Sequence, residues 1–220
     1  MDITFLGQSS FKIKGREATV VTDPYDSSIG LKFPKTEADI VTVSHSHPCH
    51  NAVANVGGNP LILTGPGEYE IKGVKIAAVT SFHDDKKGEQ RGKNVIFNMK
   101  IDSLWVCHLG DLGQGQLTSE QMEEISRVDI LLVPAGGVVT MDLSVAAKIT
   151  AELEPKIVIP MHFFDPAIIQ TGDKGDLELG TVAKFMKEMG AEGVQAEPKL
   201  AIKKDKLPEE LAVVLLKRAG

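Results

Sequence analysis

A cluster of histidines directly after an apolar segment constrains this chain more than any other feature. Three of its six histidines, His45, His47 and His50, fall in the stretch "HSHPCH", which follows the β-prone run "DIVTVS". Side chains two apart in an extended segment point to the same face, so His45 and His47 can aim their imidazoles at one point. We expect the chain to turn into a helix after Pro48, which would bring Cys49 and His50 round to a neighbouring point. Because neutral imidazole binds zinc, iron and manganese, this spacing predicts a metal site at the end of the strand.

The other three histidines occupy the same kind of position. His83, His108 and His162 each come directly after a β-prone apolar run: "IAAVTSF", "LWVC" and "IVIPM". A single histidine is more often a satisfied core or surface residue than a ligand. Packing does not explain why all six histidines lie at strand ends, whereas sheet proteins gather their functional residues where strands end. We therefore predict that these segments converge.

Composition favours one compact domain over residues 1–220. The chain has 220 residues, of which 42% are hydrophobic and 25% charged, which is enough for a substantial core. Its net charge of −6 predicts no general attraction to nucleic acid or anionic lipid. The apolar runs are too short to span a bilayer, and we expect no secretory signal. Cys49 and Cys107 each precede a histidine, which favours a reducing, cytoplasmic compartment, although a single disulfide between them stays open.

The order of the predicted elements indicates sheets covered by helices. Short strands fill the first half, and helices are predicted at residues 117–128, 141–155 and 176–190. Thr118 and Gln121 match a capping box for the first helix, and Asp142 is expected to cap the second. A long functional loop is expected at residues 163–176. Strands followed by alternating helices and strands predict an α/β fold of layered sheets.

A set of short motifs, in order, resembles one known family. The stretch "HSHPCH" looks like the HxHxDH motif of the metallo-β-lactamase superfamily, and "FHDD", "HLGDLG" and "IPMHFF" look like its later metal-ligand motifs. The stretches "GQSSFKI", "VTDPY", "RGKN", "VPAGG" and "PKIVIPMH" resemble the ascorbate-phosphate lactonase-like branch of small metal-dependent hydrolases. The resemblance extends from about residue 3 to residue 165. It implies an α/β fold built as a four-layer αβ/βα sandwich, with two mixed sheets flanked by helices.

The resemblance also implies a dinuclear metal centre, with zinc as the expected metal, although manganese or iron suits the same donors. Carried over position by position, the implied ligands are His45, His47 and His83 for the first metal and Cys49, His50 and His162 for the second. Asp111 of "HLGD" would bridge the two ions, because a carboxylate can span two cations. Asp111 and His50 would act in catalysis around a hydroxide shared by the metals. His108 matches no ligand position and would orient a ligand or the substrate.

Cys49 departs from the family motif, which has aspartate at this position. Three interpretations follow. The thiolate could ligate the second zinc, which a sulfur donor does at about 2.3 Å. The second site could instead be weakened, so that the protein works with one metal, or Cys49 could be a small buried residue in a chain with impaired catalysis. We favour the first interpretation, because two neighbouring cations would lower the pKa of the thiol.

The resulting hypothesis is a metal-dependent hydrolase that acts on a small ester, lactone or phosphorylated molecule. Arg91 and Lys93 follow His83 closely and would hold an anionic group of the substrate, or else belong to a solvated hairpin. The second hypothesis is a nuclease or phosphodiesterase of the same fold, against which the acidic, aromatic-poor composition argues. The third is a metal-binding member with a sensing or scaffolding role. We expect a small-molecule substrate and neither a nucleic-acid nor a membrane partner; a homo-oligomer is compatible with the sequence.

Overall fold

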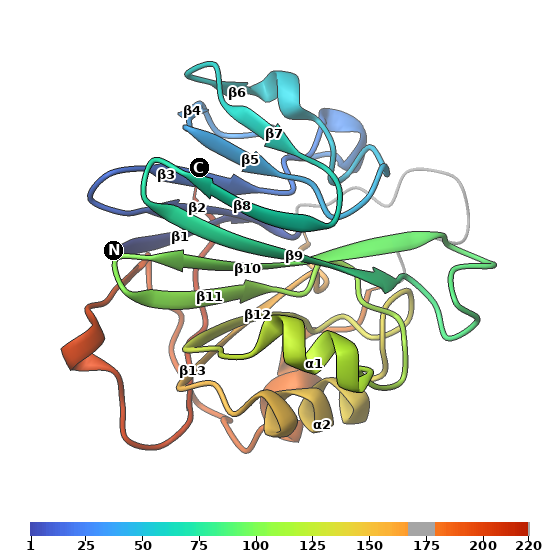
Figure 1. Ribbon diagram of the computed structural model, residues 1–220. Helices are drawn as coiled ribbons and strands as arrows, with labels where there is room; N and C mark the ends of the chain where they lie inside the picture. The colour runs from blue at the N-terminus through green and yellow to red at the C-terminus, as the bar shows by residue number, and fades with distance from the viewer. Residues whose placement is uncertain (167–178, 220) are drawn as a thin grey trace.

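Two stacked β-sheets dominate the computed structural model, which describes residues 1–166 and 179–219 (Figure 1). In the described residues the first sheet has six strands in the order β14-β1-β2-β3-β5-β7. Its strands are β1 (Asp2–Gly7), β2 (Ser10–Lys14), β3 (Thr19–Thr22), β5 (Ile40–Thr42), β7 (Leu61–Leu63) and β14 (Leu200–Ala201). β3, β5 and β7 run parallel to one another, and the pairs from β14 to β3 are antiparallel.

The second sheet has seven described strands in the order β15-β13-β12-β11-β10-β9-β8. They are β8 (Gly67–Ile71), β9 (Val74–Phe82), β10 (Lys93–Ile101), β11 (Leu104–His108), β12 (Ile130–Pro134), β13 (Ile157–Met161) and β15 (Ala212–Val213). β8 to β11 form an antiparallel meander, whereas β11, β12, β13 and β15 are parallel. A short pair, β4 (Thr36–Glu37) and β6 (Val56–Gly57), lies outside both sheets. Both sheets are therefore mixed, as predicted.

Successive residues of the central strand β10 face two different cores. Phe97 is fully buried between the sheets in one cluster with Phe5, whereas Ile96 belongs to the cluster between the second sheet and the helices, with Phe185. This alternation arises because neighbouring side chains of a strand point to opposite faces. A third cluster, which includes Tyr25, covers the outer face of the first sheet. Figure 1 shows α1 and α2 against the second sheet, on the side away from the first. The chain thus folds as a layered α/β sandwich.

The helices follow the predicted positions. α1 (Ser119–Ile125) begins with the predicted capping box, in which Gln121 N donates to Thr118 Oγ1 and Thr118 N to Gln121 Oε1. α2 (Leu143–Leu153) begins after Asp142 as predicted, although the carboxylate makes no capping hydrogen bond. α3 (Val182–Glu188) lies within the range predicted for the third helix, whose residues 176–178 lie outside the described residues. None of the described helices is long and apolar enough to cross a membrane.

Three features differ from or extend the predictions. After Pro48 the chain makes a single turn instead of entering a helix, and a 3-10 helix (Val53–Asn55) follows. The turn stops because Ala52 N donates to Pro24 O at 2.7 Å, which fastens the chain to the segment after β3. On the outer face of the first sheet, the described cover consists of loops and short 3-10 helices such as Ser27–Ile29. The loop predicted at 163–176 is described only up to residue 166, and the rest lies outside the described residues.

Candidate metal centre

The histidine and aspartate side chains converge at one edge of the two sheets. β9, β11 and β13 run in the same direction within the second sheet, so the segments that follow them start at the same edge. The segments after these three strands carry His83, Asp111 and His162, and the segment after β5 of the first sheet carries the 45–50 turn. Side chains more than 100 residues apart along the chain therefore share one site, as the strand-end pattern predicted.

The first group of donor atoms comes from the 45–50 turn and the end of β9. His45 Nε2 lies 3.0 Å from His47 Nδ1, and the ring of His83 lies 4.8 Å from that of His45 between centroids. The ligand atoms of His45, His47 and His83 all lie within 4.8 Å of one another. These three imidazoles are therefore close enough to share one cation.

The second group is centred on Asp111. Its Oδ2 lies 3.1 Å from the Nε2 atoms of both His50 and His162. The same oxygen lies 3.4 Å from His83 Nε2 and 3.8 Å from His45 Nε2, so it touches both groups. The Asp111 side chain is only 3% exposed, so it is shielded from bulk solvent. One carboxylate oxygen thus stands between the two groups of imidazoles, where a bridging ligand would be needed.

The chemistry of these donors fits divalent cations. Burial, reinforced by the charge of His50, lowers the pKa of His45 to about 2, so this imidazole is neutral and its lone pair is available. Burial alone would raise the pKa of Asp111, but the neighbouring His162 and His50 hold it well below its usual value. The contact of the buried His50 Nε2 is the carboxylate of Asp111, 3.1 Å away. Neutral imidazoles that converge on a buried carboxylate form a donor set that suits a divalent cation.

Asp23, at the end of β3, orients two of the histidines. Its fully buried carboxylate accepts hydrogen bonds from His50 Nδ1 at 2.8 Å and from the Ser44 amide and hydroxyl. The Ser44 hydroxyl in turn lies 2.9 Å from His45 Nδ1. A proton held on Nδ1 leaves Nε2 of the same ring free to bind a metal. The sequence resemblance included this aspartate in "VTDPY" but did not indicate its role.

Asn94 in β10 positions Asp111 from the other side. Its fully buried amide donates to Ser81 Oγ at 2.7 Å and to Leu109 O at 2.9 Å. Its Oδ1 accepts from the Asp111 backbone N at 3.0 Å. The sequence resemblance included this residue in "RGKN" but did not indicate its role.

His108 acts through the backbone. Nε2 donates to Ser9 O at 2.8 Å and Nδ1 accepts from Gly110 N at 3.2 Å, so both ring nitrogens are engaged. The ring is fully buried and belongs to neither donor group. It holds the Ser9 turn against the loop that carries Asp111. The structure therefore places His108 where it can orient Asp111 and gives it no free nitrogen for a substrate.

Cys49 is not a member of either donor group. Its side chain is half-buried and packs against the apolar cluster on the outer face of the first sheet. Among the described residues, its sulfur does not belong to any set of three donors that all lie within 4.8 Å. The neighbouring His50, by contrast, points its Nε2 at Asp111. The second donor group thus contains two histidines and one carboxylate.

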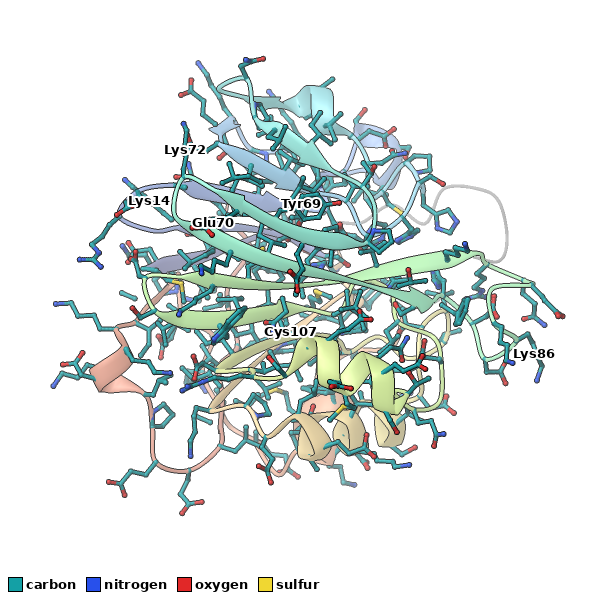
Figure 2. The ribbon with its side chains drawn as sticks, viewed as in Figure 1. Lys14, Tyr69, Glu70, Lys72, Lys86 and Cys107 are labelled. Carbon is teal, nitrogen blue, oxygen red and sulfur yellow. The ribbon has the colours of Figure 1, made fainter. Side chains whose placement is uncertain are left out.

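A hollow of about 320 Å³ opens beside His83, and Arg91 and Val139 line it. Asp84 shapes its wall, because its carboxylate accepts from four backbone amides of the 86–91 loop at 2.7–3.0 Å. Arg91 Nη1 donates to Val139 O at 2.6 Å, which ties this loop to the segment after β12. Lys93 is exposed and is not among the lining residues. The tip of the loop carries Lys86, which projects away from the body of the molecule in Figure 2.

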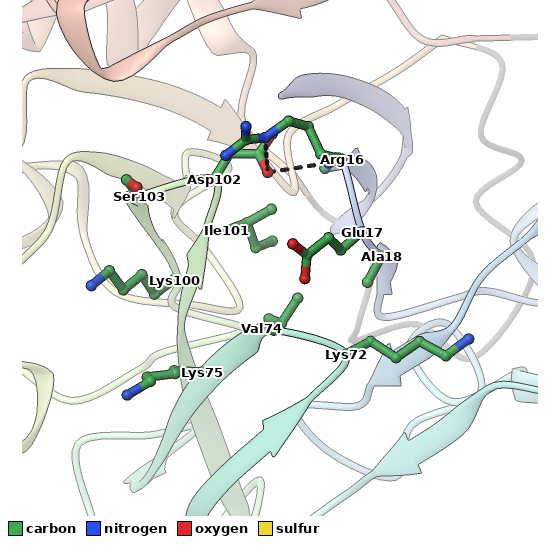
Figure 3. A pocket seen from close by; sticks show the side chains of 12 residues that line it. Arg16, Glu17, Ala18, Lys72, Val74, Lys75, Lys100, Ile101, Asp102 and Ser103 are labelled. Atoms are coloured by element: carbon green, nitrogen blue, oxygen red, sulfur yellow. Dashed lines mark hydrogen bonds and ion pairs between the residues drawn. The ribbon is translucent and has the colours of Figure 1, made fainter.

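A second hollow, of about 220 Å³, lies at the opposite edge of the sheets (Figure 3). The turns between β2 and β3, β8 and β9, and β10 and β11 form it. Lys72, Lys75 and Lys100 surround it together with Arg16, and Glu17 and Asp102 lie among them. None of the metal-site histidines lines it, so the chemistry described above belongs to the other edge.

Comparisons with known proteins agree with this geometry. The beta-lactamase superfamily domain family matches residues 2–162. The chain is 32% identical to a UPF0173 metal-dependent hydrolase of Pelotomaculum thermopropionicum over 195 residues, which cover 74% of this chain and 84% of that protein. It is 28% identical to a UPF0173 metal-dependent hydrolase of Thermococcus onnurineus over 188 residues, with 73% and 84% coverage.

A solved structure shares the whole architecture. It is the crystal structure of a Thermotoga maritima protein assigned to the Zn-dependent hydrolases of the metallo-β-lactamase superfamily, with a TM-score of 0.77 and 35% identity. The match covers 98% of this chain and 97% of that protein. Family match, relatives and structural likeness all lead to the same assignment. The chain belongs to the metallo-β-lactamase superfamily and is a metal-dependent hydrolase.

Proposed function

We propose that this hydrolase holds two zinc ions and cleaves a small ester, lactone or phosphorylated molecule that carries an anionic group. One observation carries the dinuclear part of the proposal. Asp111 Oδ2 lies within 3.1–3.8 Å of four imidazole nitrogens that belong to two separate donor groups. A carboxylate that stands between two such groups is placed to ligate two cations, one on each side.

The residues have distinct roles in this proposal. His45, His47 and His83 would hold one ion, His50 and His162 the other, and Asp111 would bridge them. A bound pair of cations would polarise the scissile group of the substrate and lower the pKa of a water molecule. Asp23 and Ser44 keep the rings of His50 and His45 oriented, and Asn94 and His108 keep Asp111 in place. No serine or cysteine nucleophile is required.

The donor set supports zinc as the metal, because imidazoles and a carboxylate at this spacing suit it, and the Thermotoga maritima protein is described as Zn-dependent. The test is metal analysis of protein purified without added metal or chelator, followed by assays on lactone, phosphodiester and thioester substrates. We expect two zinc ions per chain and hydrolysis of the lactone or a phosphorylated substrate that chelation abolishes. One ion per chain would refute the dinuclear part, and cleavage of the phosphodiester alone would favour a nuclease.

The position of Cys49 argues against ligation by the thiolate, so the second ion would be held by His50, His162 and Asp111 without a donor from residue 49. We expect Cys49→Ala to keep the wild-type metal content, because the sulfur is not among the converging donors. Cys49→Asp should tighten the second zinc by about tenfold or more if the added carboxylate reaches the ion, since charged donors contribute more than neutral ones. Competition with a chromophoric chelator measures the zinc content of Cys49→Ala and the zinc affinity of Cys49→Asp. Loss of one zinc ion from Cys49→Ala would restore the thiolate-ligand interpretation.

Arg91 is the residue best placed to hold an anionic group of the substrate, because it lines the hollow beside His83. We expect Arg91→Ala to raise KM for an anionic substrate about tenfold, the usual effect of removing a hydrogen bond to a charged group, and to spare neutral esters. Lys86→Ala is the matched control, since Lys86 is exposed at the tip of the same loop. Equal effects of Arg91→Ala on anionic and neutral substrates would discard this role.

A further inference from the structure

The metal-site histidines differ in how their second ring nitrogen is held. Nδ1 of His50 is bonded to Asp23, and Nδ1 of His45 lies at hydrogen-bond distance from Ser44 Oγ. The buried Nδ1 atoms of His83 and His162 have no partner anywhere in the described residues. Histidines that ligate metals almost always donate this N–H to a carboxylate, carbonyl or water, which sets the tautomer and the ring orientation. Nδ1 of a metal-binding His162 would therefore need a hydrogen-bond acceptor.

Gln8 also has buried polar atoms without a hydrogen-bond partner among the described residues. It is only 2% exposed, and neither its Nε2 nor its Oε1 has a hydrogen-bond partner in the part of the chain that the structure describes. Its backbone has a φ of 54°, a left-handed conformation that is unfavourable for a residue with a side chain. A buried amide without a partner destabilises a fold by about 1–3 kcal/mol. Packing alone thus gives no reason for glutamine at this position.

Gln8 and His162 are already joined through their main chains. His162 N donates to Gln8 O at 2.8 Å. The next residue, Ser9, has its Oγ 3.4 Å from Asp111 Oδ1, and its carbonyl accepts from His108. The turn that contains Gln8 is therefore fastened to the segments that carry His162 and Asp111. The side-chain amide of Gln8 and Nδ1 of His162 both lack a hydrogen-bond partner among the described residues. They belong to two residues that are joined by a main-chain hydrogen bond beside the second donor group.

We propose that Gln8 is the positioning residue of His162. Its amide oxygen accepts the Nδ1–H of His162, either directly after a rotation of the amide or through one buried water. A buried water is typically held by about three hydrogen bonds, and the two amide atoms and Nδ1 supply three polar partners. With the proton held on Nδ1, Nε2 would stay unprotonated and able to hold a metal ion. Gln8 would then do for His162 what Asp23 does for His50.

This inference rests on the proposed dinuclear zinc site, and two substitutions test it. Gln8→Met keeps the length of the side chain and removes both polar atoms, whereas Gln8→Glu keeps the acceptor. Gln195→Met, at an exposed residue away from both hollows, is the control. Zinc alone is titrated into metal-free protein against a chromophoric chelator, and thermal unfolding of each metal-free variant is measured in parallel.

We expect Gln8→Met to weaken one step of zinc binding by about 10–100-fold, the usual effect of removing such a partner, while the other step and the control stay at wild-type affinity. Gln8→Glu should retain both steps within about threefold, because a carboxylate is at least as good an acceptor. Metal-free Gln8→Met should melt near the wild-type temperature, since methionine fills nearly the same volume. Weaker zinc binding without lower stability separates positioning from a merely structural role.

Three results would overturn the inference. The first is wild-type zinc affinity in Gln8→Met, and the second is an equal loss of zinc affinity in Gln8→Met and Gln8→Glu. The third is a loss of hydrolysis in Gln8→Met while both zinc affinities stay at the wild-type value. The last result would make Gln8 a residue that contacts substrate. A wild-type chain that takes up only one zinc refutes the dinuclear proposal instead. In that case the affinity of each variant for the single zinc ion is compared, and an unchanged affinity in Gln8→Met would show that Gln8 does not position His162.

Discussion

Asp111→Asn should lower hydrolysis by about 10²–10³-fold, the range seen when one preorganised electrostatic group is removed from an active site. The substitution should also leave no more than one zinc ion per chain. The reason is the position of Oδ2, which lies 3.1 Å from the Nε2 atoms of His50 and His162 and 3.4 Å from that of His83. An amide has nearly the same shape but lacks the negative charge that offsets two cations. Metal analysis and steady-state kinetics on the same preparation measure both effects.

The control for this substitution is Asp205→Asn, which changes the net charge equally at an exposed residue of the 3-10 helix Lys204–Lys206. It should keep two zinc ions and wild-type rates. Asp111→Asn protein that retains both ions and more than a tenth of the activity would show that Asp111 does not bridge the metals. Loss of fold is monitored by thermal unfolding, so that inactive and unfolded protein are distinguished.

Gly113→Ala should damage the metal centre through the backbone. A Cβ at this position would lie 2.3 Å from His83 O, 2.4 Å from His83 C and 2.6 Å from Asp84 N. These are backbone atoms, and Gly113 N donates to Phe82 O at 2.9 Å, so neither segment can give way without breaking that contact. We expect a loss of about 1–3 kcal/mol in the free energy of unfolding, as for other overpacked positions. For a chain of this length that lowers the melting temperature by about 2–4 °C per kcal/mol.

The same substitution should separate His83 from Asp111, so zinc content and activity should fall together. Gly115→Ala is the matched control in the same loop, because a Cβ there would meet no atom within 4 Å. It should leave the melting temperature, zinc content and rate at wild-type values. Gly113→Ala protein with unchanged stability and metal content would show that the His83 and Asp111 segments can move apart without harm to the site.

The sequence predicted the local structure of this protein well where neighbouring residues decide it. The capping box of Thr118 and Gln121 needs only four consecutive residues, and it forms as predicted. The helix predicted after Pro48 did not form, because a contact from Ala52 to Pro24, distant in sequence, holds the chain in a turn. Asn94 and Gln8 lie in the family-like stretches "RGKN" and "GQSSFKI", but the sequence did not indicate their roles, since these arise from the segments that pack against them.

The sequence alone determined which residue types stand at the strand ends, and the alternation in "HSHPCH" placed His45 and His47 on one face, because side-chain direction along a strand is a local property. Only the tertiary structure decided which atoms meet. Parallel pairing of β11, β12 and β13 brings His162 beside Asp111, and stacking of the sheets places the 45–50 turn against both. The same packing draws His50 inward and leaves Cys49 against an apolar cluster. These distances depend on strand pairing and sheet packing between segments far apart in the chain, which residue spacing does not encode.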